Sequence, residues 1–233
     1  MTNPLKIFKI MYMVKENVKS VLAQIPEHNP FGEKVTVVGA VKFQSVENIN
    51  SAICAGLRDI GDNHVQEFKE KYELIEGSPR RHFIGHLQTN KVKYLIGKVD
   101  LYHSVDRMNL AEELSKRSAG AGIVSEILLQ VNIGSEISKG GFELEEIEQA
   151  YKQIKELPAL KITGLMAMLP LSDDEELLAE LAKKMRQKFD KLKAEDNNFK
   201  YLSMGMSGDW QICVREGANM IRLGTSLFGK RSY

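Results

Sequence analysis

The sequence predicts one α/β domain with the architecture of a (β/α)8 or TIM barrel. Short apolar, β-branched segments alternate with longer amphipathic segments along the whole chain, a pattern typical of parallel βαβ units. Eight such short segments are present, and the length of 233 residues is close to the roughly 250 residues of this fold. An open doubly wound sheet would show the same alternation, so the strand count leaves that alternative open.

The elements follow one another in a regular order. A helix over 7–25 is expected to precede the barrel and to end at Pro26. The first strand, over 35–41, is almost continuously apolar, as in a parallel sheet buried on both faces. The other expected strands cover 57–62, 82–86, 101–105, 126–133, 161–168, 201–206 and 220–223, and the helices between them cover 46–55, 64–76, 89–96, 107–118, 143–156, 173–194 and 208–217. No shift in composition divides the chain, so we expect a single domain over 1–233 with an extra N-terminal helix.

Composition excludes several classes of function. The 32 basic and 31 acidic residues nearly cancel, giving a net charge of +1, which argues against a nucleic-acid-binding or membrane-surface protein. No apolar run approaches the roughly 20 residues of a membrane span, and no leader segment stands out. We therefore expect a cytoplasmic protein. Its cysteines, Cys54 and Cys213, are expected to be reduced and buried.

A (β/α)8 barrel builds its active site at the carboxyl ends of its strands. Polar residues are therefore candidates for a functional site when the sequence places them at these strand ends. His86 is expected to end the third strand, although a histidine in such a place is more often a hydrogen-bonded structural residue. The residues that the sequence places at these ends are Lys42, Asn63, His86, Met166, Ser203, Ser207, Arg222, Gly224 and Thr225. None of the His, Cys or carboxylate residues has metal-ligand spacing, so no metal is expected.

Lys42 follows the first strand directly, so its amine should point into the mouth of the barrel. Apolar surroundings favour an uncharged amine, which is the form that condenses with an aldehyde. A lysine after a strand is usually only a surface charge, and a functional interpretation therefore needs a second observation.

That second observation is a predicted phosphate site. The segments 203–209 and 222–226 are rich in Gly and hydroxyl residues and follow strands seven and eight, where (β/α)8 enzymes often bind phosphate. Backbone N–H groups at a helix start favour an anion, and Ser207, Gly224 and Thr225 are the expected donors. Ordinary turns have a similar composition. A reactive lysine facing a phosphate site predicts pyridoxal 5′-phosphate (PLP) as the cofactor, with Arg222 as the partner of its pyridine nitrogen.

An ordered set of short motifs carries a family resemblance. These are VK at 41–42, GDNHVQE at 61–67, FIGHLQTNK at 83–91, HSVD at 103–106, SKGGF at 138–142, GLM at 164–166, SMGMS at 203–207 and IRLGTSLFG at 221–229. With these motifs the chain resembles the PLP homeostasis protein family from about residue 35 to residue 228. The resemblance implies a barrel like the N-terminal domain of alanine racemase (PLP fold type III), without that enzyme's second domain.

The resemblance also implies a function. Lys42 would bind PLP as a Schiff base, Arg222 would contact the pyridine nitrogen, and Ser207, Gly224 and Thr225 would hold the phosphate. The protein would act in vitamin B6 homeostasis without robust turnover and without a catalytic residue, and its partners would be PLP and PLP-dependent apo-enzymes. The alternative is a PLP-dependent amino-acid racemase of fold type III, and weak activity of that kind stays open. A third hypothesis is an enzyme of the same fold that acts on a phosphate ester without PLP. A monomer is expected because no long apolar surface stripe stands out.

The chain departs from the family pattern near Lys42. Family members usually have Ser before this lysine and Thr after it, often with another Lys and a Pro beyond, whereas this chain has Val41 and the segment Phe43-Gln44-Ser45. A role for a second lysine in this loop is therefore in doubt. Lys139, in the loop after the fifth strand, is the residue that the resemblance suggests as a second acceptor of PLP or as a gate of the mouth.

Overall fold

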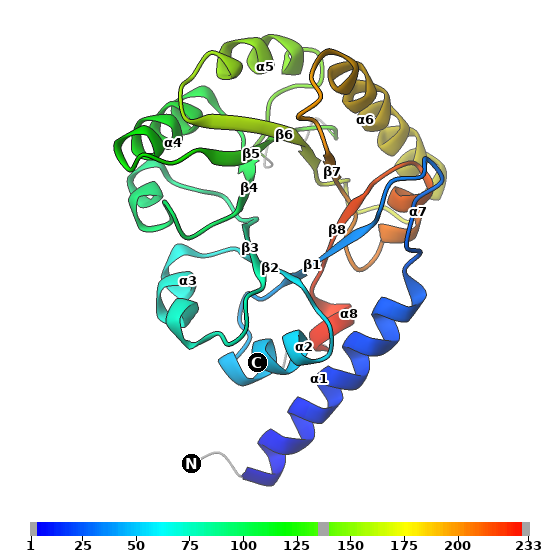
Figure 1. The fold of residues 1–233 in the computed structure, drawn as a ribbon. Helices are drawn as coiled ribbons and strands as arrows, with labels where there is room; N and C mark the ends of the chain where they lie inside the picture. Colours follow the sequence, from blue (N-terminus) through cyan, green and yellow to red (C-terminus); the bar gives the residue numbers. More distant parts are fainter. Residues whose placement is uncertain (1–3, 135–139, 230–233) are drawn as a thin grey trace.

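The computed structural model describes residues 4–134 and 140–229, with side chains from residue 11 onward. Eight parallel strands form a closed barrel in sequence order, and β1 pairs with β8 to complete it (Figure 1). The strands are β1 Thr36–Ala40, β2 Asp59–Asp62, β3 Arg80–Phe83, β4 Leu101–Val105, β5 Ser125–Val131, β6 Leu160–Ala167, β7 Tyr201–Ser203 and β8 Met220–Leu223. Closure confirms the predicted (β/α)8 barrel and rules out the open sheet.

Helices surround the strands on the outside of the barrel (Figure 1). They are α1 Pro4–Gln24, α2 Val46–Cys54, α3 Val65–Lys71, α4 Met108–Gly120, α5 Ile147–Lys155, α6 Glu175–Glu195, α7 Trp210–Arg215 and α8 Thr225–Phe228, with the 3₁₀ segments η1 Tyr72–Leu74 and η2 Thr89–Tyr94. The additional helix α1 packs against α2 and α8 through residues that include Val14 and Val18, both fully buried. No helix in the described ranges is long and apolar enough to cross a membrane.

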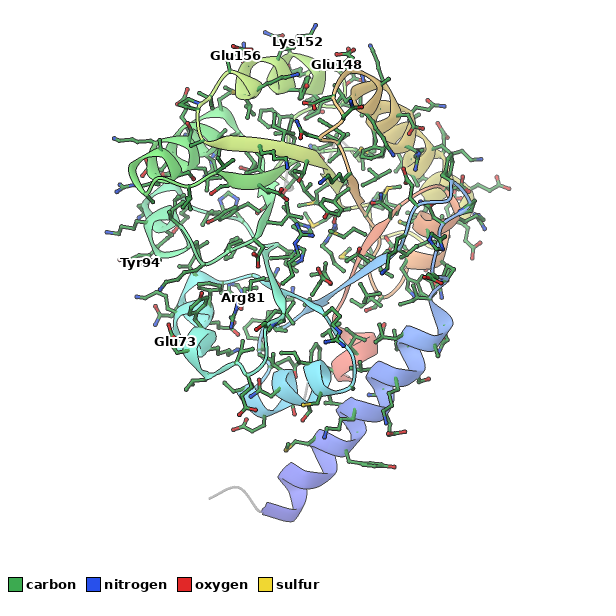
Figure 2. All side chains as sticks on the ribbon, in the orientation of Figure 1. Glu73, Arg81, Tyr94, Glu148, Lys152 and Glu156 are labelled. Carbon is green, nitrogen blue, oxygen red and sulfur yellow. The ribbon has the colours of Figure 1, made fainter. Side chains whose placement is uncertain are left out.

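Side chains fill the ring that the strands enclose (Figure 2). Val38, Leu101, Leu128, Met166 and Met220 form an apolar cluster that draws on five different strands. Such a barrel interior is a packed core and not a pore. Within the barrel, the space for a ligand therefore lies above this layer, where the strands end.

The third strand differs from its prediction. We expected it over 82–86, but β3 covers Arg80–Phe83 and pairs along its length with Asp59–Asp62. The predicted strand did not include Arg80 and Arg81. They remain half-buried because the Arg81 guanidinium lies over the Tyr72 ring at 4.4 Å, while that of Arg80 lies over Tyr201 at 5.0 Å, contacts that suit an amphipathic side chain.

Two other predictions are also corrected. The segment expected as a helix over 89–96 is the 3₁₀ segment η2, because Asn90, Val92 and Tyr94 are weak helix formers in a six-residue stretch. Cys213 is buried as expected, but Cys54 is exposed, since it lies in the last turn of α2, on the side away from the barrel core.

Candidate functional site

The carboxyl ends of β1 and β8 and the loop after β7 enclose a pocket of about 290 Å³. Because β1 pairs with β8, the first and last strands of the chain meet here. The pocket brings together five of the nine predicted residues, Lys42, Ser207, Arg222, Gly224 and Thr225, and is also lined by Ala40, Gln44, Met206, Gly208 and Gly229. We refer to it as the Lys42 pocket.

Lys42 lies two residues beyond the end of β1. A turn follows the strand, in which Gln44 N–H donates to the Val41 carbonyl at 3.1 Å and Phe43 has a φ of 62°. The Phe43 N–H is held by the Glu67 carboxylate at 2.8 Å. Lys42 is half-buried, and its amine forms no hydrogen bond or ion pair with any residue in the described parts of the chain. The amine is therefore available to a ligand in the pocket.

Arg222 forms the floor of the pocket and is only 6% exposed. Its Nη1 donates to the Ser203 carbonyl at 2.9 Å and to Ser203 Oγ at 2.6 Å, and its Nη2 donates to the Ala167 carbonyl at 2.9 Å. No carboxylate pairs with it in the described residues, and burial lowers the pKa of the guanidinium to about 10. Among the described residues Arg222 is thus a buried cation without a counter-ion, and they leave two of the five N–H donors of an arginine for a ligand acceptor.

The opposite wall of the pocket has the properties of an anion site. Gly205, with a φ of 105°, turns the chain after β7, and a Cβ there would lie 3.0 Å from Cys213 Cβ and 3.1 Å from Trp210 Cα. The turn places Ser207 opposite the start of α8, where Ser226 N–H approaches Ser207 Oγ at 3.4 Å. The first N–H groups of a helix have no partner within the helix, so this wall offers a hydroxyl and backbone donors to an anion.

Asn63 and His86 line a neighbouring pocket of about 530 Å³ above β2 and β3, together with Lys69, Lys91 and Tyr94. The side chain of Asn63 contributes a buried Oδ1 without a partner in the described residues. His86 lies three residues beyond the end of β3, so the expectation that it ends this strand is wrong. Its exposed ring contacts Asp106 Oδ2 at 3.1 Å. Figure 2 shows Tyr94 on the outer side of the barrel, where it forms the far edge of this pocket.

The remaining two predicted residues lie below the mouth. Met166 belongs to the apolar cluster of the barrel interior and is 1% exposed. Ser203 is fully buried and contacts Arg222. Neither lines the Lys42 pocket or the pocket beside it, so any effect of theirs on a ligand in these pockets would pass through their neighbours. Lys139 lies outside the described residues.

The sequence analysis did not predict the burial of two polar features beside the site. Asp62, at the end of β2, is 2% exposed and its Oδ2 has no partner in the described residues. The buried histidines His82 and His103 contact each other inside the barrel, Nδ1 to Nε2, at 2.8 Å. Polar residues within otherwise apolar strands were the available signal, because a parallel barrel strand is expected to be apolar on both faces.

Comparison with known proteins places this geometry in a family. A family model described as the N-terminal domain of alanine racemase matches residues 9–232. The pyridoxal phosphate homeostasis protein of Aquifex aeolicus is 44% identical over 199 residues, which cover 84% of this chain and 87% of that protein. The chain belongs to the pyridoxal phosphate homeostasis protein family. The Escherichia coli K12 family member is 35% identical over 206 residues, covering 86% of this chain and 88% of that protein.

Solved structures agree with this assignment. PipY of Synechococcus elongatus PCC7942, solved without PLP, superposes with a TM-score of 0.84 at 31% identity and covers 93% of this chain and 100% of its own. The same protein solved with PLP bound gives a TM-score of 0.79 at 30% identity. Alanine racemase of Clostridium difficile 630 gives 0.77 at 14% identity, covering 97% of this chain and 60% of the racemase. That last likeness concerns the fold alone. The resemblance to the pyridoxal phosphate homeostasis family is confirmed.

Proposed function

We propose that this chain binds PLP in the Lys42 pocket and serves PLP homeostasis, holding the cofactor as a Schiff base on Lys42 without robust turnover. The observation that carries the proposal is the combination in one pocket of a lysine amine and a buried guanidinium, neither of which has a charged partner among the described residues. The names of the relatives and the PLP-bound PipY structure support it.

Each wall of the pocket matches one part of PLP. The Lys42 amine suits the aldehyde, and the free donors of Arg222 suit the lone pair of the pyridine nitrogen. Ser207, Gly224 and Thr225 suit the phosphate. Bound PLP supplies an electron sink, and the sink is strongest when its ring nitrogen is protonated. Arg222 has no proton to give up at neutral pH, because even its lowered pKa is about 10, so it favours a neutral nitrogen and a weak sink.

The lining of the pocket also favours a carrier over an enzyme. A racemase needs a second acid or base on the face of the substrate opposite the lysine. The described lining residues other than Lys42 and Arg222 offer only hydroxyl, amide, thioether and aliphatic groups. The described residues of this pocket can hold and release an aldehyde, and they offer no second group suited to moving a proton. We also propose that the protein is a cytoplasmic monomer and that its partners are PLP-dependent apo-enzymes.

Borohydride reduction tests the central claim. The PLP-incubated protein is reduced, digested and analysed by mass spectrometry, beside Lys42→Ala and the control Lys91→Ala, which alters only the neighbouring pocket. A pyridoxyl group on Lys42 in the wild type and in Lys91→Ala, and its loss in Lys42→Ala, is the expected result. An adduct that persists in Lys42→Ala, or no adduct at all, would refute the proposal.

Two further variants separate binding from folding. Arg222→Gln and Ser207→Ala should release PLP faster than the wild type does during dialysis, followed by absorbance. The thermal midpoint of the PLP-free protein should be lowered much less than PLP retention is. An equal loss of stability without PLP would show that these side chains act structurally. Steady chiral conversion of an L-amino acid by the loaded protein would contradict the carrier function and favour the racemase alternative.

A further inference from the structure

A line of hydrogen bonds crosses the barrel interior from the amino ends of the strands to Arg222. The consecutive contacts are Asp59 Oδ1 to His82 Nε2 at 2.9 Å, His82 Nδ1 to His103 Nε2 at 2.8 Å, His103 Nδ1 to Ser203 Oγ at 3.1 Å, and Ser203 Oγ to Arg222 Nη1 at 2.6 Å. Both imidazoles and the serine are fully buried. Four strands contribute side chains, in addition to the one that carries Arg222.

The direction of every hydrogen bond between Asp59 and Ser203 follows from the carboxylate at one end of the line. Burial, the largest influence, lowers the pKa of both histidines, so each ring carries one proton. A carboxylate only accepts, and His82 therefore donates from Nε2 to Asp59 and accepts at Nδ1. His103 must then donate from its own Nε2 and accept at Nδ1.

The other end is compatible with the same direction. Arginine only donates, so Ser203 Oγ accepts from Arg222, and the remaining Ser203 proton can point toward His103 Nδ1, which the Asp59 end makes an acceptor. In the reverse direction the His103 ring would donate to Ser203, and the lone pair of His82 Nε2 would face the Asp59 carboxylate. One arrangement satisfies all the groups, and in it each proton points away from the pocket and toward Asp59.

We propose that Asp59, His82, His103 and Ser203 are positioning residues that fix the guanidinium of Arg222 in its pocket-facing geometry. The negative end of the chain lies at Asp59, whose side chain is 15% exposed. The line thereby connects the Asp59 carboxylate to the Arg222 guanidinium, which has no carboxylate partner of its own among the described residues. Two main-chain carbonyls accept from two further guanidinium N–H groups, and Ser203 Oγ is the only side-chain acceptor that Arg222 contacts in the described residues.

The tautomers test the direction without any variant or cofactor. The chain has five histidines, so long-range ¹H–¹⁵N correlation spectra of the PLP-free protein remain simple to assign. His82 and His103 should both appear as neutral rings protonated at Nε2 at neutral pH. A proton on Nδ1 of either ring would overturn the proposed direction.

Ser203→Ala tests the positioning role. Its matched control is Ser118→Ala, which removes another fully buried serine hydroxyl, one bonded to Ser125 Oγ at 2.8 Å and remote from the pocket. Because the change removes one hydrogen bond to a charged group, Ser203→Ala should weaken PLP retention by about tenfold. It should also alter the absorbance spectrum of the bound cofactor, whereas Ser118→Ala should change neither.

Equal retention of PLP and equal spectra in the two serine variants would overturn the positioning role. The inference rests on the proposed function only for this second test. If Lys42 carried no adduct while both rings showed the Nε2 tautomer, the PLP proposal would fail and the hydrogen-bond direction would stand. If the adduct formed and the tautomers differed, the direction alone would fail.

Discussion

Asp62 is a buried carboxyl group that should destabilise the fold at neutral pH. It ends β2, is 2% exposed, and has an Oδ2 without a partner in the described residues. Burial raises its pKa from 3.8 to about 6, although the charges of Arg81 and Lys71 lower it. We predict that Asp62→Asn, which keeps the shape and removes the charge, increases the stability of the protein at neutral pH.

The magnitude and the pH range follow from the pKa. A change from 3.8 to about 6 corresponds to about 3 kcal/mol between the two protonation states. Between these values the folded protein binds the proton more tightly than the unfolded chain does, so this group makes stability fall as pH rises. The penalty is absent below pH 3.8 and complete above about pH 6. Asp62→Asn should therefore gain up to about 3 kcal/mol at neutral pH and little in acid.

Urea unfolding of the PLP-free protein at a series of pH values measures this difference. Comparison with the wild type cancels the opposite pH dependence of the other carboxylates, and Asp173→Asn, at an exposed aspartate, controls for loss of a charge. In thermal unfolding, a gain of 1 kcal/mol corresponds to about 2–4 °C for a domain of this size. A gain in the free energy of unfolding of Asp62→Asn that does not change with pH would refute the reasoning, and so would a loss of stability at neutral pH.

Three other changes have clear expected outcomes. Gly164→Ala should prevent folding, seen as loss of soluble protein, because a Cβ there would lie 1.8 Å from a carbonyl oxygen of β7 at a φ of 153°; normal solubility would contradict this. Burial raises the pKa of Glu33, but hydrogen bonds from Arg186, Lys193 and Asn29 hold the pKa below its ordinary value. Glu33→Gln should therefore lower the free energy of unfolding by about 1–3 kcal/mol at neutral pH. The loss should become smaller as pH falls, and urea unfolding measures it. A thiol reagent should modify Cys54 quickly because it is exposed, and Cys213 only on unfolding because it is buried and burial raises the pKa of its thiol. Equal modification rates at the two cysteines would disprove this.

The sequence was sufficient for the alternation of strands and helices because these signals are local and repeated, whereas the pairing of β1 with β8 distinguished the closed barrel from an open sheet. The apolar run of β1 and the alternation of strands and helices do not depend on distant partners. The start of β3 was missed because Arg80 and Arg81 have a polar composition, and only their aromatic neighbours explain how they lie in a strand. Those neighbours, Tyr201 and Tyr72, come from other parts of the chain, and no local pattern indicates them.

The candidate site was predictable to the extent that its residues lie at strand ends. Lys42 and Arg222 were found in this way and line one pocket. The placement of Asn63 and His86 in a neighbouring pocket depends on the exact end of β3, which the sequence misplaced. The contact between His82 and His103 depends on which strand residues face the interior, and in a barrel that is set by the tilt and stagger of all the strands together.

Barrel closure is the step that turns two separate signals into one site. Lys42 follows the first strand and the Gly224–Thr225 turn follows the last, so neither segment can hold a ligand until β1 and β8 pair. A molecule held by both ends binds the closed barrel and not the unfolded chain, and it must stabilise that closure by mass action. Arg222 belongs to the same ladder, with Val38 as its partner across the seam, and its guanidinium is bonded back to β6 and β7. Arg222, which would recognise the cofactor, therefore also joins the last strands of the barrel to the first.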